Sequence, residues 1–95
     1  MSDPLAIRGI PRNLTSYVCV DVIGGDRPIL FVTRADGDWC FLCGSDDPTD
    51  PSVYRVAGIG HVLDLDPTVA EVLDLGVDEE ADRAVVGGPW TRTPC

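Results

Sequence analysis

Two cysteines separated by two residues, Cys40 and Cys43, have the clearest chemical potential in this sequence. Such a pair supplies two of the four ligands of a tetrahedral zinc site when the backbone turns between the thiols. Completing the site would require Cys19, His61 or Cys95, none of which forms a second close pair. In an extended strand, however, Cys40 and Cys43 point to opposite faces. We therefore predict that this pair does not bind a metal. The alternative interpretation is a small metal- or thiol-dependent protein centred on Cys40 and Cys43.

The competing interpretation of these cysteines is that both are small buried hydrophobic residues, as thiols in protein cores commonly are. A redox dithiol would place its first cysteine at a helix N-terminus, where the thiolate is stabilised. Cys40 instead follows a predicted hairpin turn at Asp36 and Gly37. We therefore expect no cofactor at this pair.

No convincing catalytic group accompanies the cysteines. His61 is the only histidine, and no serine or cysteine is recognisable as its partner in a triad. Asp46, Asp47 and Asp50 share one loop, but the EF-hand pattern is absent and the prolines favour a solvated turn. The sequence therefore predicts no catalytic residue and a protein that is not an enzyme.

The charge of the chain is one-sided, with 16 acidic residues against 7 arginines and a formal net charge of −9. Phosphate backbones and anionic membranes are bound through basic patches, so we expect neither nucleic acid nor membrane as a partner. A basic protein is compatible with this charge. The first twenty residues contain no basic segment followed by an apolar one, and four cysteines without such a signal indicate a cytoplasmic protein.

Two acidic groups and one aromatic residue are the candidates for binding a basic partner. The groups are Asp46, Asp47 and Asp50, and then Asp78, Glu79, Glu80 and Asp82. Both lie in predicted turns, so their carboxylates are expected to be solvated and to steer a basic protein. Trp90 would act as an anchor if it were exposed. Solubility, which net charge supplies without any partner, is the competing explanation.

Three predicted strands begin the scaffold that must position these side chains. They cover residues 17–23, 29–33 and 39–43. Apolar residues alternate in the first, β-branched and aromatic residues fill the second, and the third is apolar on both faces, as inner strands are. Short links between them predict an antiparallel meander. Trp39 and Phe41 should be largely buried.

Shorter elements are predicted in the second half of the chain. They are strands at 53–57, 84–86 and 90–92, an acidic connection at 77–82 and a weak helix at 58–65. A further helix is framed by Asp66 as its N-cap, Pro67 in its first position and Gly76 at its C-terminal end.

These elements predict a single α+β domain over residues 1–95, with an extended lead-in at 1–15 and a tail at 93–95. We expect a mainly antiparallel sheet of four or five strands with one or two short helices on one face.

Three motifs of the chain resemble those of a family of small bacterial domains. They are Asp36–Gly44 with Trp39 and Phe41, Asp66-Pro67 with Leu73, and Ala81-Asp82-Arg83 followed by Gly88-Pro89-Trp90. Over about residues 17–92 the chain is similar to the immunity-protein-like domains numbered thirty-three in the polymorphic-toxin immunity series. The resemblance implies a non-enzymatic protein-binding domain with a toxin as its partner, and it carries no catalytic residue. Cys40 and Cys43 are not part of the family pattern.

Overall fold

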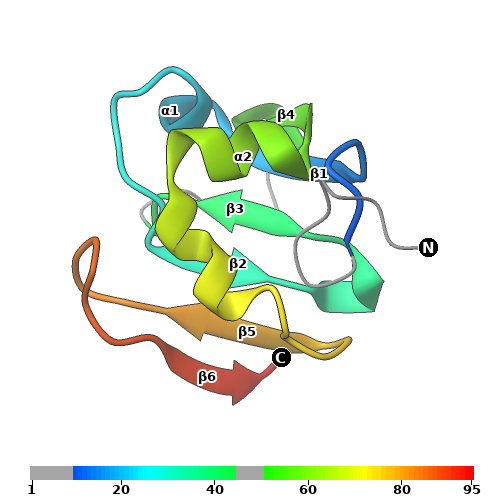
Figure 1. The fold of residues 1–95 in the computed structure, drawn as a ribbon, viewed down its shortest axis with the longest axis vertical. Helices are drawn as coiled ribbons and strands as arrows, with labels where there is room; N and C mark the ends of the chain where they lie inside the picture. The colour runs from blue at the N-terminus through cyan, green and yellow to red at the C-terminus, as the bar shows by residue number, and fades with distance from the viewer. Residues whose placement is uncertain (1–9, 45–50) are drawn as a thin grey trace.

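The structure is a computed structural model that describes residues 10–44 and 51–95 of the chain (Figure 1). The described residues form one six-stranded sheet in the order β4-β1-β3-β2-β5-β6. The strands are β1 (Thr15–Cys19), β2 (Phe31–Thr33), β3 (Cys40–Leu42), β4 (Tyr54–Gly58), β5 (Glu79–Asp82) and β6 (Thr91–Pro94). β1 and β3 run parallel, and the other neighbouring strands run antiparallel.

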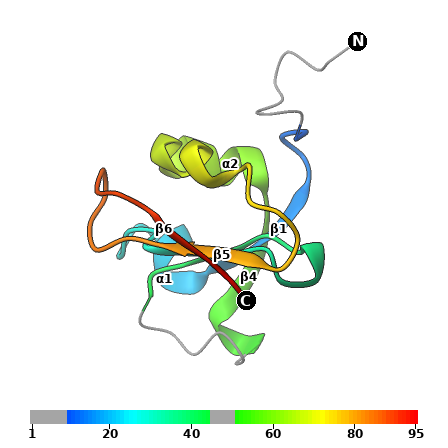
Figure 2. The same cartoon turned by 90° about the horizontal axis from the view of Figure 1, so that it is seen from below.

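Short helices complete the fold. They are α1 (Val20–Ile23), α2 (Ile59–Leu65) and the 3-10 turns η1 (Ala35–Gly37), η2 (Pro51–Val53) and η3 (Pro67–Val72). Seen along the sheet, α2 and the turns that follow it lie on one face (Figure 2). The predicted α+β class is therefore confirmed, whereas the prediction of four or five strands is wrong. None of the helices in the described part of the chain is long and apolar enough to cross a membrane.

The predicted meander of the first three strands is wrong in its order. β3 returns between β1 and β2 and pairs with β1 in parallel, with Tyr17 opposite Cys40. The first strand stops at Cys19 because the chain turns into α1, where the Gly24 N–H donates to the Val20 carbonyl at 3.0 Å. The valines of this segment favour a strand locally, but the crossover of the chain past β3 overrides that preference. The inner position predicted for the third strand is confirmed.

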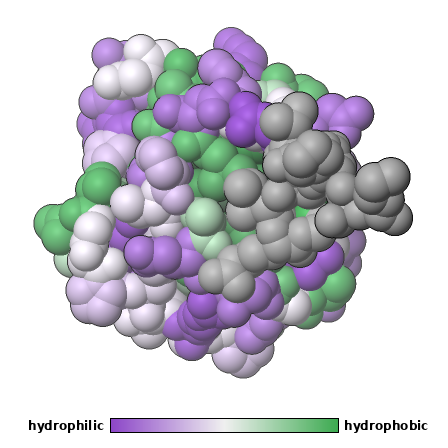
Figure 3. Space-filling model, in the orientation of Figure 1, coloured by the Kyte–Doolittle hydropathy of each residue, from purple (hydrophilic) through white to green (hydrophobic). Residues whose placement is uncertain are grey.

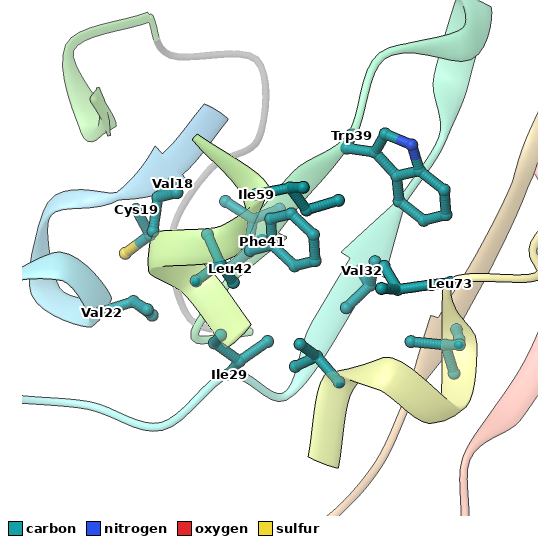
Figure 4. Close-up of a cluster of buried hydrophobic side chains, with 14 of the residues drawn as sticks. Val18, Cys19, Val22, Ile29, Val32, Trp39, Phe41, Leu42, Ile59 and Leu73 are labelled. Atoms are coloured by element: carbon teal, nitrogen blue, oxygen red, sulfur yellow. The ribbon is translucent and has the colours of Figure 1, made fainter. Parts of the chain in front are cut away.

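A row of side chains in register across four strands fills the layer beneath the helices. It consists of Val18, Phe41, Val32 and Ala81, none of which has any exposed surface. Ile59 of α2 and Leu73 after η3 pack against this row (Figure 4). Trp39 stacks on Phe41 with ring centroids 6.2 Å apart, and the tryptophan is 2% exposed. The predicted burial of Trp39 and Phe41 is confirmed.

The start of η3 matches the prediction and its end does not. The Asp66 carboxylate accepts the Thr68 N–H at 3.0 Å, and Pro67 occupies the first helical position. The turns are 3-10 and stop at Val72, well before Gly76, whose φ lies outside the left-handed range. The Gly76 N–H donates instead to the Glu79 carboxylate, so Gly76 is not the C-terminal glycine of a helix.

The end of the chain differs most from the prediction. β5 occupies the segment expected to be an acidic connection, while residues 84–86, expected to be a strand, lie in the turn after it. Acidic residues disfavour strands, but β5 needs only one inward side chain, Ala81, and its backbone pairs with both β2 and β6. β6 continues to Pro94, so most of the predicted tail is strand. Of the predicted lead-in, residues 1–9 lie outside the described part, and Ile10 packs against the core.

Candidate functional site

The structure separates Cys40 from Cys43. Cys43 is buried with its sulfur 3.7 Å from that of Cys19, whereas Cys40 is half-buried and hydrogen-bonds with the side chain of Thr33. In the described part of the chain, the one group of three potential metal ligands is Cys19, Asp21 and Cys43. The metal site considered for Cys40 and Cys43 therefore has no support in the geometry.

Cys40 is also a poor nucleophile. Burial raises the pKa of its thiol, the charge of Asp38 adds to the rise, and the hydrogen bond with Thr33 opposes it. The thiol therefore stays protonated at neutral pH, and the thiolate is the reactive form. His61, the other candidate for catalysis, lies exposed on α2. The absence of a catalytic role for either residue stays a prediction.

Cys40 belongs to a second row of side chains, on the face of the sheet opposite α2 and η3 (Figure 2). In register across the six strands, the row runs Val56, Tyr17, Cys40, Thr33, Glu80, Thr93. Because neighbouring residues of a strand point to opposite faces, this row alternates with the buried one. Its members are half-buried or exposed, and Val56 is 67% exposed. This face of the sheet therefore has partly exposed side chains along the whole row.

Part of this face forms a hollow of about 420 Å³, the aromatic groove. It is lined by Tyr17, Ala35, Asp38, Cys40, Tyr54 and Val56. The rings of Tyr17 and Tyr54 meet edge to face with centroids 6.5 Å apart. Arg55 also borders the groove, but its guanidinium donates to the Tyr54 carbonyl at 2.9 Å. The groove thus combines aromatic and aliphatic walls with an acidic edge at Asp38.

Five acidic residues, the acidic rim, gather at the end of the sheet beside this groove. They are Asp36, Asp38, Asp78, Glu79 and Glu80. Backbone hydrogen bonds bring the two segments together, because Arg34 donates to the Glu79 carbonyl at 2.9 Å and accepts from the Asp78 N–H at 2.9 Å. Desolvation and then the charges of Glu80, Asp78 and Glu79 raise the pKa of the Cys95 thiol. The carboxylates of Asp78, Glu79 and Glu80 therefore lie near the C-terminal Cys95.

The acidic rim divides into residues that shape the backbone and residues that face solvent. The Asp78 carboxylate accepts the Asp36 N–H at 2.8 Å, and the Glu79 carboxylate accepts the Gly76 N–H. Glu80 belongs to the outer row, where its carboxylate accepts a 3.3 Å hydrogen bond from Thr93. Asp78 is exposed in a turn, as predicted, but its carboxylate also fixes the backbone at Asp36. Glu79 differs from the prediction, because it is half-buried and lies in β5 rather than in a turn. The side chains of Asp36 and Asp38 are exposed, and Asp46, Asp47 and Asp50 lie outside the described residues.

We expect Asp78→Ala to lower the free energy of unfolding by about 1–2 kcal/mol. Asp78 adopts a positive φ of 63°, which alanine tolerates poorly, and alanine also removes the acceptor for Asp36. Asp78→Asn keeps an acceptor oxygen and a residue type suited to that backbone. Its free energy of unfolding should therefore lie within about 0.5 kcal/mol of that of the natural protein. Urea denaturation of both variants measures the difference. Equal stabilities would show that Asp78 is not needed for the turn.

Trp90, the candidate anchor, is half-buried beneath Arg83, whose guanidinium carbon lies 4.2 Å from the ring centroid. Arg83 has a fully buried side chain and donates to Asp66 Oδ2 at 2.7 Å and to Thr68 Oγ1 at 2.7 Å. It also donates twice to the Ile29 carbonyl, at 2.9 and 3.1 Å. Asp66, Arg83 and Trp90, which belong to the motifs behind the family resemblance, therefore meet in one structural network.

The residues missed from the sequence are those of the aromatic groove, Tyr17, Tyr54 and Val56. The signal for them was present, since Tyr54 and Val56 alternate in a predicted strand and so share one face. What the sequence does not show is that β4 pairs with β1 and places Val56 beside Tyr17.

Comparison of the chain with family models, with curated proteins and with solved structures finds no match. The resemblance to immunity-protein-like domains therefore stays a prediction.

Proposed function

We propose that this chain is a non-enzymatic, acidic protein-binding domain of the cytoplasm, immunity-like in function, whose partner is a basic protein. The observation that carries the proposal is the position of the acidic rim beside the exposed aromatic groove. Such a surface takes an apolar or aromatic side chain of the partner against the rings of Tyr17 and Tyr54 and the side chain of Val56. Lysine or arginine side chains next to that anchor would meet Asp38 and Glu80.

Within the described residues, the ion pairs that arginines form all involve acids outside the acidic rim. Of the six arginines in the described part of the chain, four form ion pairs: with Asp64, Asp21, Asp66 and Asp74. None of these acids belongs to the rim. Arg34, the basic residue closest in sequence to the rim, donates to the Leu75 carbonyl at 2.7 Å and covers the Trp39 ring at 5.1 Å. The field of the rim therefore extends into solvent, where it attracts a basic surface.

A second hydrophobic surface competes with the groove as a docking site. In Figure 3 a hydrophobic projection stands at the left, where Figure 1 places the turn between β5 and β6. That turn carries Val85 and Val86, which are 61% and 50% exposed. Asp26 and Arg27 line the hollow next to it, so opposite charges offset each other there. The acidic rim and the aromatic groove therefore fit a basic partner better than the surface at Val85 and Val86 does. Substitution of Val85 serves as the control for substitution of Val56 in the groove.

The electrostatic test compares two double variants that each remove two negative charges. Asp38→Asn with Glu80→Gln neutralises the rim, and Asp26→Asn with Glu71→Gln changes exposed acids elsewhere. The partners tried in the assay are basic proteins, and the product of any toxin gene that neighbours the gene for this chain is tried first. At low salt the rim variant should associate on the order of tenfold more slowly, while the control variant should stay close to the natural rate. The difference should shrink once salt shortens the screening length below roughly 10 Å.

The contact itself is tested by Val56→Ala against Val85→Ala, two exposed valines on different surfaces. Val56→Ala should speed dissociation and leave association almost unchanged, because the side chain contacts the partner only after docking. A further variant, in which Asp46, Asp47 and Asp50 are changed to asparagine, is measured in the same association assay. Equal association rates for the rim and control variants, or faster dissociation only for Val85→Ala, would place binding elsewhere.

A further inference from the structure

Cys19, Asp21 and Cys43 form a cluster that the proposed binding surface does not use. Their ligand atoms, two thiol sulfurs and a carboxylate oxygen, all lie within 4.8 Å of one another. Cys19 ends β1, Cys43 follows β3 directly, and Asp21 lies in α1. Because β1 and β3 run parallel, their carboxyl ends meet at the same edge of the sheet. The parallel pairing therefore brings together residues that an antiparallel meander would keep apart.

The distance between the two sulfurs suits a metal ion. Tetrahedral zinc with Zn–S bonds of about 2.3 Å separates two sulfur ligands by about 3.8 Å. The sulfurs of Cys19 and Cys43 are 3.7 Å apart, with the Cys19 thiol donating a hydrogen bond to Cys43. A disulfide would require the sulfurs to approach to about 2.05 Å, a much larger movement. The separation of the two sulfurs is therefore closer to that of two zinc ligands than to that of a disulfide.

Asp21 supplies the third ligand and Cys43 provides access. The Asp21 side chain is 40% exposed and forms a long 3.9 Å ion pair with Arg27, and a carboxylate oxygen lies within 4.8 Å of both sulfurs. Cys43 borders a surface hollow of about 560 Å³ that Arg27 and Phe31 also line. An ion can approach along this hollow although Cys19 itself is fully buried.

We infer that Cys19, Asp21 and Cys43 bind one thiolate-preferring divalent cation, zinc, with its fourth position open to water. Binding converts both thiols to thiolates and releases two protons, so two thiolates and one carboxylate face a charge of +2. Arg27, beside Asp21, offsets the negative charge that remains. The ion ties the ends of β1 and β3 to α1. This inference does not depend on the proposed binding of a basic protein.

The test titrates zinc alone into the reduced, metal-free chain carrying Cys95→Ser, which removes the exposed thiol as a competing ligand. A chromophoric chelator reports affinity and stoichiometry, and cobalt in place of zinc reports thiolate coordination by its charge-transfer absorption. We expect one equivalent of zinc, a cobalt–thiolate band and a higher Tm with zinc, since an ion that binds only the folded state stabilises it.

Three variants in the same background locate the site. Asp21→Asn alters an exposed side chain, so the fold should persist. Zinc affinity should fall by at least the roughly 10- to 100-fold that loss of an outer-shell partner costs. Cys43→Ser should abolish the cobalt–thiolate band, with circular dichroism checking that the variant is folded. Cys40→Ser is the control and should bind zinc as the parent does.

Three outcomes would overturn the inference. The first is absence of zinc binding by the reduced parent. The second is unchanged zinc affinity in Asp21→Asn together with an unchanged cobalt spectrum in Cys43→Ser. The third is formation of a Cys19–Cys43 disulfide with glutathione disulfide by a chain that binds no zinc, which would identify a redox dithiol instead.

Discussion

Arg83→Ala is expected to lower the free energy of unfolding by about 3–5 kcal/mol, the range for breaking a buried ion pair by removing one partner. The Arg83 side chain has no exposed surface, and that of Asp66 is 13% exposed. Alanine would leave the Asp66 carboxylate and the Ile29 carbonyl without their charged donor and would uncover one face of Trp90. A domain of this size has a total stability of about 5–15 kcal/mol, so the substitution removes a large share of it.

The chain offers a matched control for this prediction in Arg92→Ala. Arg92 pairs with Asp74 at the same 2.7 Å separation, but the two side chains are 39% and 48% exposed. Exposed ion pairs contribute about 0–1 kcal/mol, so Arg92→Ala should change stability by no more than about 1 kcal/mol. Urea denaturation followed by circular dichroism measures both variants. Similar losses for Arg83→Ala and Arg92→Ala would show that burial of the Arg83 network does not determine its contribution.

Elements that depend on neighbouring residues were predicted well from the sequence. Asp66 and Pro67 begin η3 because capping needs only the next turn of the chain. α2 carries the predicted apolar stripe, with Ile59, Val62 and Leu63 buried. Likewise, the double-sided apolar pattern of the third strand requires an inner position, whichever strands flank it.

Features that depend on which strands become neighbours could not be predicted in this way. The parallel pairing of β1 with β3 arises because the chain passes from β1 through α1 to a place beyond β3. The alternating valines of that segment do not indicate which position in the sheet the next strand will take. The closeness of Cys19 to Cys43 and the joining of Tyr17 with Val56 both follow from these pairings. The candidate sites are therefore consequences of topology, although every residue in them is visible in the sequence.

The acidic segment at the start of β5 shows a different reason for error. Its composition resembles a solvated connection. Glu79 and Glu80 nevertheless lie at the start of β5, where Glu80 is opposite Thr33, the last residue of β2. Pairing with β2 and β6 determines the conformation, and Asp78 before the strand is held in a left-handed turn by its bond to Asp36. A charge pattern identifies carboxylates, but only the hydrogen bonds show which of them remain available to a partner.

Trp39→Ala should also destabilise the domain by about 3–5 kcal/mol, because it removes a large buried aromatic side chain and leaves a cavity in the core. Trp39 lies nearly parallel to Phe41, at an interplanar angle of 8°, and the Arg34 guanidinium covers it at 5.1 Å. Alanine would leave a cavity next to Phe41 and expose Arg34 to solvent. Circular dichroism is the appropriate probe in urea, since the substitution removes one of the two tryptophans that fluorescence would report.

Two further variants serve as controls for this prediction: Trp39→Phe, a conservative replacement, and Val56→Ala, a change at an exposed position. Phenylalanine keeps a ring to stack on Phe41, so Trp39→Phe should recover a large part of the loss and remain folded if the alanine variant does not. Val56, 67% exposed on the open face, should tolerate alanine within about 0.5 kcal/mol. Melting of Trp39→Ala close to that of the natural chain would mean that Trp39 is a surface residue. In that case the tryptophan, rather than the pair Tyr17 and Tyr54, would become the first candidate for anchoring a partner.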